Sequence, residues 1–442
     1  MFEFGLPILL LTAGAWLLSR RADDPNYSVA MALYGLLLGV AVGITLQASA
    51  VTGDFSSPYL GGSDGEGYFV QAHLLAQAGI LDFQTLIRSN YLGYQIVLAA
   101  MFALFSPSLL VGLLTNAAMI LGALACVQRA TFVLTRDNRA AFFAVIACML
   151  TTAHVYYALV LLKEPALLLA LALVLLSLSK IYQDGRFGTR PLIYAAIALA
   201  IIISMRATLL LFLALLMVLV GRQLAQKRAS GVAILVGLAI IAAPLAANFS
   251  VYTLDSAFVL ESITANSVVL DRFSEGDLEL GGIAGSAGTF FLAQPFYLKL
   301  LLFLVPTGVQ ALLPFDVWNT QFLTDYAPSF FYRNLNILWL GIVFPWLLYT
   351  LLSLRRIEAP LISRFFIAGI AYFVFIAIIY GGLIPRYAST ALVFVYPGIG
   401  YWWAQRGSSA TVRSTTGQFF LLYYVVALVA VIGYAALRLL RG

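Results

Sequence analysis

Two carboxylates stand close together in a glycine-rich stretch, Gly-Gly-Ser-Asp-Gly-Glu-Gly-Tyr, in which one residue separates Asp64 from Glu66. A carboxylate can act as a general base toward a hydroxyl group, and two carboxylates can bind a divalent cation such as Mg²⁺ or Mn²⁺. The glycines on both sides let the backbone approach a ligand closely. The same composition is typical of an ordinary solvated loop. The stretch alone therefore leaves three interpretations open: a loop, a base or a metal site.

Three further sites place a cation where the apolar sequence is interrupted: Lys163-Glu164-Pro165, Arg206 and Arg386-Tyr387. Ionisable residues inside or at the edge of a membrane are costly, which makes them functional candidates. A guanidinium group also matches phosphate oxygens in a bidentate manner. Other interpretations stay open, because a tight turn explains Glu164 and Pro165 at a helix start. Arg386 and Tyr387 also fit an interfacial pair that reaches the lipid headgroups.

The chain that carries these residues is dominated by apolar side chains. Of its 442 residues, 62% are hydrophobic and 10% are charged, whereas soluble domains contain about 45–50% apolar and about 25% charged residues. No soluble fold could bury this much apolar surface, so the composition predicts a polytopic integral membrane protein. Cys126 and Cys148 lie in apolar runs, which favours free thiols over a disulfide or a metal site. The net charge of +6 reports topology rather than nucleic-acid binding.

Apolar runs long enough to cross about 30 Å of hydrocarbon predict about 12 transmembrane helices. They lie near residues 4–19, 29–48, 108–127, 140–160, 165–181, 191–205, 207–221, 231–249, 336–353, 365–383, 388–404 and 417–438. The first run is interpreted as a retained helix, because no basic region precedes it. Two shorter or broken runs, 91–105 and 296–314, are predicted to be juxtamembrane or re-entrant helices. The expected fold class is all-α, with residues 1–442 forming a single transmembrane domain.

Six basic clusters divide the connections between these helices into two sides. They are Arg20/Arg21, Arg129/Arg136/Arg139, Lys180/Arg186/Arg190, Arg222/Lys227/Arg228, Arg355/Arg356/Arg364 and Arg406/Arg413. The positive-inside rule assigns all six clusters to the cytoplasm, so the remaining connections face outward. Two of these are long, an outer loop at 50–90 and a second at 250–295. If 91–105 and 296–314 instead cross the membrane fully, the middle of the chain inverts.

This orientation places the carboxylates and the isolated cations on one outer face. Within the first outer loop, polar and apolar residues interleave from 67 to 87, which predicts an amphipathic helix in the membrane interface. Cations at the lipid boundary could hold a phosphate or pyrophosphate leaving group and stabilise its developing charge. A carboxylate beside them could deprotonate an acceptor hydroxyl. The pattern therefore indicates chemistry on a lipid-linked anion.

At these residues the sequence resembles the GT-C superfamily of polytopic glycosyltransferases, which includes protein O-mannosyltransferases and lipid A aminoarabinose transferases. That family places an essential Asp, often within Asp-Glu-x-x-Tyr, in its first large outer loop. Here Asp64 and Tyr68 occupy the Asp and Tyr positions, Gly65 replaces the Glu, and Glu66 follows one step later. Lys-Glu-Pro resembles a turn of bacterial members with unknown sugar specificity, and Ile-Pro-Arg-Tyr-Ala-Ser-Thr resembles a late Arg-Tyr motif.

The resemblance implies transfer, with inversion, of a sugar from a polyprenyl-phosphate-linked donor to a glycan, lipid or protein acceptor. It implies a multi-pass protein of the bacterial inner membrane whose active site faces the periplasm or exterior. The base would be Asp64, with Glu66 as an assistant or metal ligand. The implied donor phosphate-binding residues are Lys163, Arg206, Arg386 and Tyr387, and the supporting residues are Tyr68, His73 and Glu164. No cofactor is expected, although Mg²⁺ or Mn²⁺ at the two carboxylates stays open; membrane lipids, and no nucleic acid, are the other expected partners.

Two other classes of protein share some of these features. An O-antigen-type polysaccharide polymerase or ligase would also have a polar outer loop and a similar number of spans. It typically depends on outer-loop Arg and His, whereas Arg272 is the only basic residue between 250 and 295. A secondary transporter would favour internal repeats and charges near the bilayer midplane. The sequence has neither feature, so the glycosyltransferase interpretation is preferred.

Overall fold

The computed structural model describes residues 2–20, 22, 24–52, 63–78, 92–186, 188–206, 209–226, 338–379 and 389–441. Within these ranges every regular element is a helix and no strand occurs. The predicted all-α fold class is therefore confirmed for the described part of the chain. The span 231–249, the loop 250–295, the segment 296–314 and the pair Arg386-Tyr387 lie outside the described residues.

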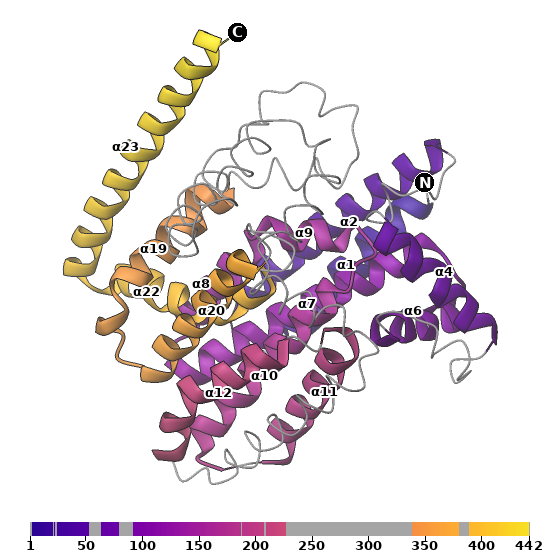
Figure 1. The fold of residues 1–442 in the computed structure, drawn as a ribbon, viewed down its shortest axis with the longest axis horizontal. Coiled ribbons are helices and arrows are strands. Elements are labelled where there is room, and N and C mark those ends of the chain that lie inside the picture. Colours follow the sequence, from indigo (N-terminus) through magenta and orange to yellow (C-terminus); the bar gives the residue numbers. More distant parts are fainter. Residues whose placement is uncertain are drawn as a thin grey trace.

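Figure 1 labels the longer helices of the described ranges in chain order. In the first half they are α1 (Phe2–Ser19), α2 (Pro25–Thr52), α4 (Ser63–Ala78), α6 (Leu92–Phe105), α7 (Leu109–Thr135), α8 (Asn138–Met149), α9 (Thr152–Ala158), α10 (Glu164–Asp184), α11 (Thr189–Met205) and α12 (Leu209–Gln226). In the second half they are η3 (Trp339–Val343), α19 (Phe344–Leu352), η4 (Leu354–Arg356), α20 (Pro360–Ile379), η5 (Ser389–Phe394), α22 (Tyr396–Ser408) and α23 (Ala410–Arg441).

The chain is an α-helical membrane protein. By length and composition, four described helices can cross a membrane, and the bent pair α8–α9 would provide a fifth span. The four lie at Pro25–Ser49, Leu109–Thr135, Glu164–Asp184 and Ala410–Val429. Several other predicted spans correspond to apolar helices of 10–17 residues. The total of about 12 spans, based on hydrocarbon thickness, stays a prediction.

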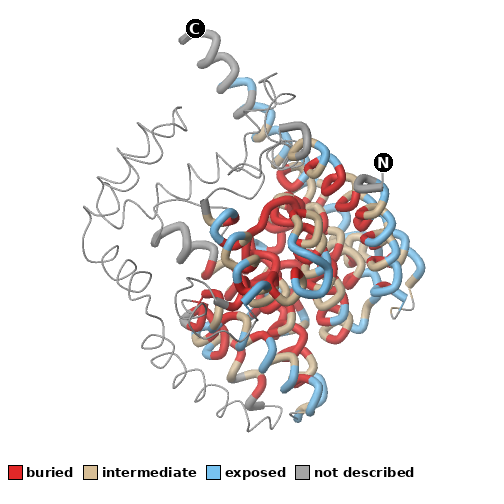
Figure 2. The backbone as a smooth tube through the Cα atoms, turned by 90° about the vertical axis from the view of Figure 1, so that its right-hand side faces the viewer, coloured by how far each residue is buried: buried red, intermediate tan, exposed pale blue. Residues whose placement is uncertain are grey.

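Helices α7 and α10 form the centre of the bundle. They pack against each other, α11 packs on α10, and α8 packs on both α7 and α22. Figure 2 shows that the buried residues concentrate in this part of the molecule, whereas α23 extends away from it. The close approach of α22 to α8 depends on Gly400, where a Cβ atom would lie 2.7 Å from the backbone nitrogen of Ala144.

The predicted continuous span at 140–160 is interrupted in the structure. Helices α8 and α9 meet at an angle of 61°, and the break falls at Leu150 and Thr151. Thr151 Oγ1 donates a hydrogen bond to Ala147 O, a local bond that bends helices. The same oxygen accepts a hydrogen bond from Tyr396 Oη, 245 residues later. A distant contact therefore holds the bend, which a hydropathy pattern cannot indicate.

Helices α4 and α6 lie at the edge of the bundle (Figure 1). The predicted interfacial helix begins at Ser63, so Asp64 and Glu66 belong to its first turn rather than to a flexible loop. Acidic residues are favoured there by the helix dipole. Phe69 packs edge-on against Phe102, so tertiary contacts offset the low helix propensity of the glycines. With 14 residues, α6 is about 21 Å long, too short for a full crossing and in agreement with the juxtamembrane prediction for 91–105.

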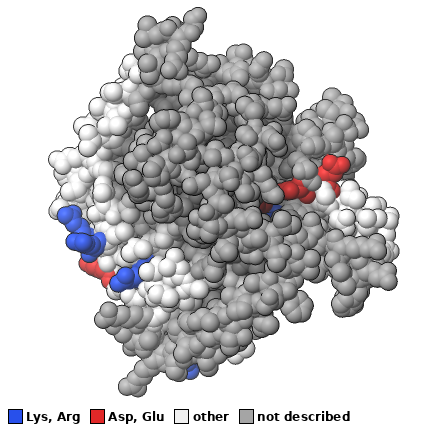
Figure 3. All heavy atoms as spheres, viewed as in Figure 1, with Lys and Arg blue, Asp and Glu red and all other residues white. Residues whose placement is uncertain are grey.

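Basic side chains of the bundle gather at one end. One cavity there is lined by Arg129, Arg136, Lys180, Arg186 and Arg190 together with Asp184. A neighbouring cavity is lined by Arg139, Arg406 and Arg413 together with Asp24. Both cavities lie at the turn between α7 and α8, so they belong to the same end. Figure 3 shows basic atoms at the left and lower edges of one face, and acidic atoms at its right edge over α4. The side of the membrane that each end faces stays a prediction.

Candidate functional site

The opposite end of the bundle contains a buried cluster of charged side chains. Lys163 and Glu164 stand where α10 begins, and Arg206 follows the last residue of α11. Their exposed fractions are only 4%, 1% and 8%, in that order. Arg206 Nη2 lies 3.5 Å from Glu164 Oε1, which makes an ion pair between the two helix ends. These three charged side chains are therefore deeply buried.

The helix ends explain why Glu164 and Arg206 are tolerated at this place. A helix N-terminus carries a partial positive charge and favours an acid, whereas a C-terminus favours a cation. Glu164 occupies the first position of α10, and Arg206 occupies the C-cap of α11, where its backbone N–H bonds Ile202 O. The dipoles of two adjacent helices thus match the ion pair. The prediction that Lys163 and Arg206 share one face agrees with this arrangement.

Asn116 of α7 holds the segment that leads into this cluster. Its Nδ2 group donates to Val160 O at 2.7 Å and to Tyr157 O at 3.2 Å. Its Oδ1 atom accepts a hydrogen bond from Tyr94 Oη at 2.9 Å. Residues 159–163 are buried and not helical, so their carbonyl groups need partners from elsewhere in the fold. One amide side chain therefore supports the backbone that presents Lys163.

Two contacts connect α4, which carries Asp64, to the same end of the bundle. The ring of Tyr68 packs edge-on against that of Tyr94, with 5.1 Å between centroids. One residue earlier, Gly93 approaches α11 so closely that a Cβ atom would collide with the side chain of Ser204. The start of α6 thus touches both α4 and the end of α11 that carries Arg206.

The two carboxylates of α4 face in different directions. Asp64 lies four residues before Tyr68, and residues at this spacing share one face of a helix. It is half-buried, whereas Glu66 is exposed. Two residues on a helix are turned by about 200° relative to each other, so α4 does not direct both carboxylates toward one cation. Within the described ranges, no three His, Cys, Asp or Glu side chains are grouped as metal ligands usually are.

The remaining predicted site residues separate into three groups. Tyr68 is buried at the contact between α4 and α6, as expected of a supporting residue. His73 lies nine residues after Asp64, about 14 Å along the helix axis, and its Nε2 is 3.0 Å from Gln77 Nε2. Arg386 and Tyr387 lie outside the described residues.

Sequence reasoning missed three polar residues of this region. Tyr157 Oη lies 2.9 Å from Ser389 Oγ, so η5 is hydrogen-bonded to α9 beside the cluster. Asn116 and Tyr94 were also not singled out. The available signal for Asn116 was its polar amide in the middle of the apolar run 108–127. Such a side chain inside a membrane requires hydrogen-bond partners. The predicted site was chosen from charged residues at interruptions of the apolar sequence and from polar residues close to them in the chain.

Replacing Asn116 by Leu is expected to lower the free energy of unfolding by more than about 3 kcal/mol, because each unsatisfied buried group costs about 1–3 kcal/mol. Tyr94→Phe removes only one of the bonds and should cost about 1 kcal/mol. Chemical unfolding of the purified protein in detergent measures both variants. Equal losses for the two variants would contradict a central role of the Asn116 side chain.

The fold and the site together define the class of protein. The chain is an α-helical membrane protein with a buried cluster of two cations and one acid at one end of its bundle. No protein-family model, no curated protein and no solved structure matches it.

Proposed function

We propose that the protein is a membrane glycosyltransferase of the GT-C type that uses a polyprenyl-phosphate-linked sugar as donor. The observation that carries this proposal is the buried cluster of Lys163, Glu164 and Arg206. Asp64 lies on α4, and α6 contacts both α4 and the end of α11 that carries Arg206. Two cations buried together where one helix begins and another ends suit a phosphate at the depth of the lipid headgroups. A carboxylate on an adjoining edge helix suits an acceptor that arrives from water.

The proposed reaction is a single displacement with inversion at the anomeric carbon. An acceptor hydroxyl oxygen forms a bond to that carbon while the bond from the carbon to the phosphate oxygen breaks. The bonding electron pair leaves with polyprenyl phosphate, whose new negative charge Lys163 and Arg206 stabilise. Asp64 takes the proton of the acceptor hydroxyl. The products are the glycosylated glycan, lipid or protein and free polyprenyl phosphate.

The burial of the cations supports their proposed role in catalysis. The surrounding packing shields the Arg206 and Lys163 side chains from solvent. The site therefore needs little reorganisation when negative charge develops on the leaving group. Electrostatic interactions are also stronger in such a water-poor place than at an exposed surface. Glu164 keeps the guanidinium of Arg206 in position before the donor binds. In our proposal this end of the bundle faces the exterior of a bacterial inner membrane.

Membranes from cells that produce the protein contain every acceptor that those cells supply, which allows a direct test. We would add a panel of polyprenyl-phosphate sugars that carry an isotope label and measure label in the acceptor fraction and free polyprenyl phosphate. Membranes with the wild-type protein are expected to exceed membranes with the Asp64→Asn variant at equal protein level. Equal transfer in both, for every donor of the panel, would contradict the proposal.

A further inference from the structure

The basic end of the bundle contains a cavity of about 670 Å³ between the last turns of α7 and α10 and the first turn of α11. Its basic lining residues are Arg129, Arg136, Lys180, Arg186 and Arg190, and its acidic lining residue is Asp184. The positive-inside rule explains why cations lie on this side of a membrane. It does not explain why cations from three helices converge on one recess.

The protein supplies these five cations with little negative charge. Among the residues that the structure describes, none of these five cations has an ion-pair partner within 4.0 Å. Asp184 borders the cavity but lies beyond that distance from every one of the five. Like charges that share a recess repel one another, and such a recess concentrates anions from its surroundings. The missing counter-charge is therefore expected to come from a ligand.

Two features of the recess suit an anion. The guanidinium of Arg129 lies 5.6 Å from the ring centre of Phe132, and the ammonium of Lys180 lies 5.0 Å from that of Tyr194. Such cation–π contacts restrict the two side chains. In addition, α11 begins at Gly188, which offers no side chain to cap the helix. The first amide groups of α11 therefore add a further anion-binding element at the cavity.

The depth of the cavity indicates where its anion comes from. Arg129 lies six residues before the end of α7, or about 9 Å inside the helix. Lys180 lies four residues before the end of α10, or about 6 Å inside it. These cations stand at the level of the last helical turns, where lipid phosphates lie, and basic pockets between helices at this level bind anionic headgroups. We propose that the cavity binds the phosphate headgroup of an anionic phospholipid.

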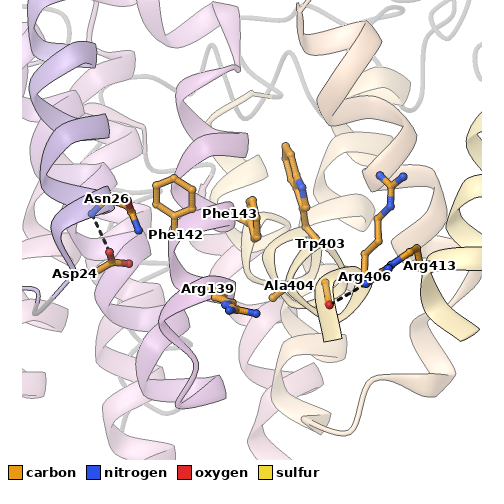
Figure 4. A pocket seen from close by; sticks show the side chains of 10 residues that line it. Asp24, Asn26, Arg139, Phe142, Phe143, Trp403, Ala404, Arg406 and Arg413 are labelled. Carbon is orange, nitrogen blue, oxygen red and sulfur yellow. Dashed lines mark hydrogen bonds between the residues drawn. The ribbon is translucent and has the colours of Figure 1, made fainter. Parts of the chain in front are cut away.

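The neighbouring basic cavity, shown in Figure 4, differs from this one in that one of its cations already has a hydrogen-bond partner. There Arg413 Nη2 donates to Gly407 O at 3.2 Å, at the end of α22. Arg406 stacks over the ring of Phe420, and Asp24 faces the cavity from the other side. In that cavity the guanidinium of Arg413 already donates a hydrogen bond to a backbone carbonyl group near the C-terminal end of α22. The proposal therefore concerns the cavity between α7, α10 and α11.

The full-length protein, purified in a neutral detergent, allows a test by native mass spectrometry with phosphatidylglycerol, with phosphatidylcholine and with inorganic phosphate as competitor. We expect bound phosphatidylglycerol, little phosphatidylcholine and no competition by millimolar phosphate. The double variant Arg129→Gln/Arg190→Gln should bind phosphatidylglycerol about tenfold or more weakly, because each cation near a surface favours anionic lipid. The matched control, Arg355→Gln/Arg356→Gln, removes the same charge from η4, which lines neither cavity.

Three results would overturn the assignment. If the control pair weakens lipid binding equally, the effect comes from the net charge of the protein alone. If inorganic phosphate displaces the lipid, the ligand of the cavity is a soluble anion rather than a lipid. The variant Arg129→Lys keeps the charge and should retain binding, which separates loss of the site from loss of the fold. Failure of Arg129→Lys to bind while Arg355→Gln/Arg356→Gln binds normally would also contradict a site that recognises charge. None of these measurements depends on sugar transfer, so the inference stands apart from the proposed function.

Discussion

Replacing Asp64 by Asn is expected to reduce sugar transfer about 10²–10⁴-fold, the usual contribution of a general base. Asn is close to Asp in size and accepts hydrogen bonds, but it cannot take the proton of an acceptor hydroxyl. The folded protein should keep its stability within about 1 kcal/mol, the typical scale of one charge at a helix N-terminus. The measurement is the rate of labelled-sugar transfer at saturating donor, together with chemical unfolding of the purified variant.

Glu66→Gln provides the comparison for Asp64→Asn, because it removes the same charge from the same helical turn. Glu66 is exposed and turned away from the face of α4 that carries Tyr68, so we expect a loss of less than tenfold, which corresponds to about 1.4 kcal/mol. Losses of equal size for the two variants would contradict Asp64 as the single base. They would favour the interpretation in which both carboxylates hold a divalent cation, and added Mg²⁺ or Mn²⁺ would then raise the rate.

Replacing Arg206 by Gln is expected to lower the free energy of unfolding by about 3–5 kcal/mol, because it removes one partner of a buried ion pair. Glu164, which is 1% exposed, would then lose the guanidinium 3.5 Å from its Oε1 atom. Adding Glu164→Gln should restore most of the stability, since the buried pair is then replaced by two neutral amides. Chemical unfolding in detergent measures the single and the double variant.

Activity of the double variant separates a structural from a catalytic role for the pair. If Arg206 binds the donor phosphate, Arg206→Gln/Glu164→Gln should be stable and still transfer sugar at least about 10²-fold more slowly, the scale of one lost transition-state contact. Recovery of both stability and transfer would show that the ion pair serves the fold alone. No loss of stability in Arg206→Gln would contradict the burial of the pair itself.

Helix positions were largely predictable, because apolar runs of the necessary length report helices regardless of their packing. The run 165–181 corresponds to α10 (Glu164–Asp184), which starts beside Pro165 and ends at Gly185 with φ 63°. Both signals are local and visible in the sequence. The bend between α8 and α9 was not predictable, because the contact between Tyr396 and Thr151 joins residues far apart in the chain.

The predicted site was correct in one local respect and incomplete in another. Sorting charges by topology placed Lys163, Glu164 and Arg206 at the same end, and the structure pairs two of them. The flexible loop expected around Asp64 is instead the first turn of α4. Glycines suggest flexibility when taken alone, but the packing of Tyr68 on Tyr94 and Phe69 on Phe102 favours the helix. The amide of Asn116 was overlooked because its importance comes only from its partners.

The sequence by itself determined that this is an α-helical membrane protein, and it predicted that six basic clusters lie on one side of the membrane. Both conclusions rest on the free-energy cost of exposing polar backbone groups and charges to lipid. Each segment of the chain avoids this cost through its own sequence, independently of the other segments. Only the tertiary structure decided that Arg206 pairs with Glu164, that α6 joins α4 to the end of α11, and that five cations share one cavity. These features depend on which helices pack together, and that choice follows from close contacts between residues distant in the chain.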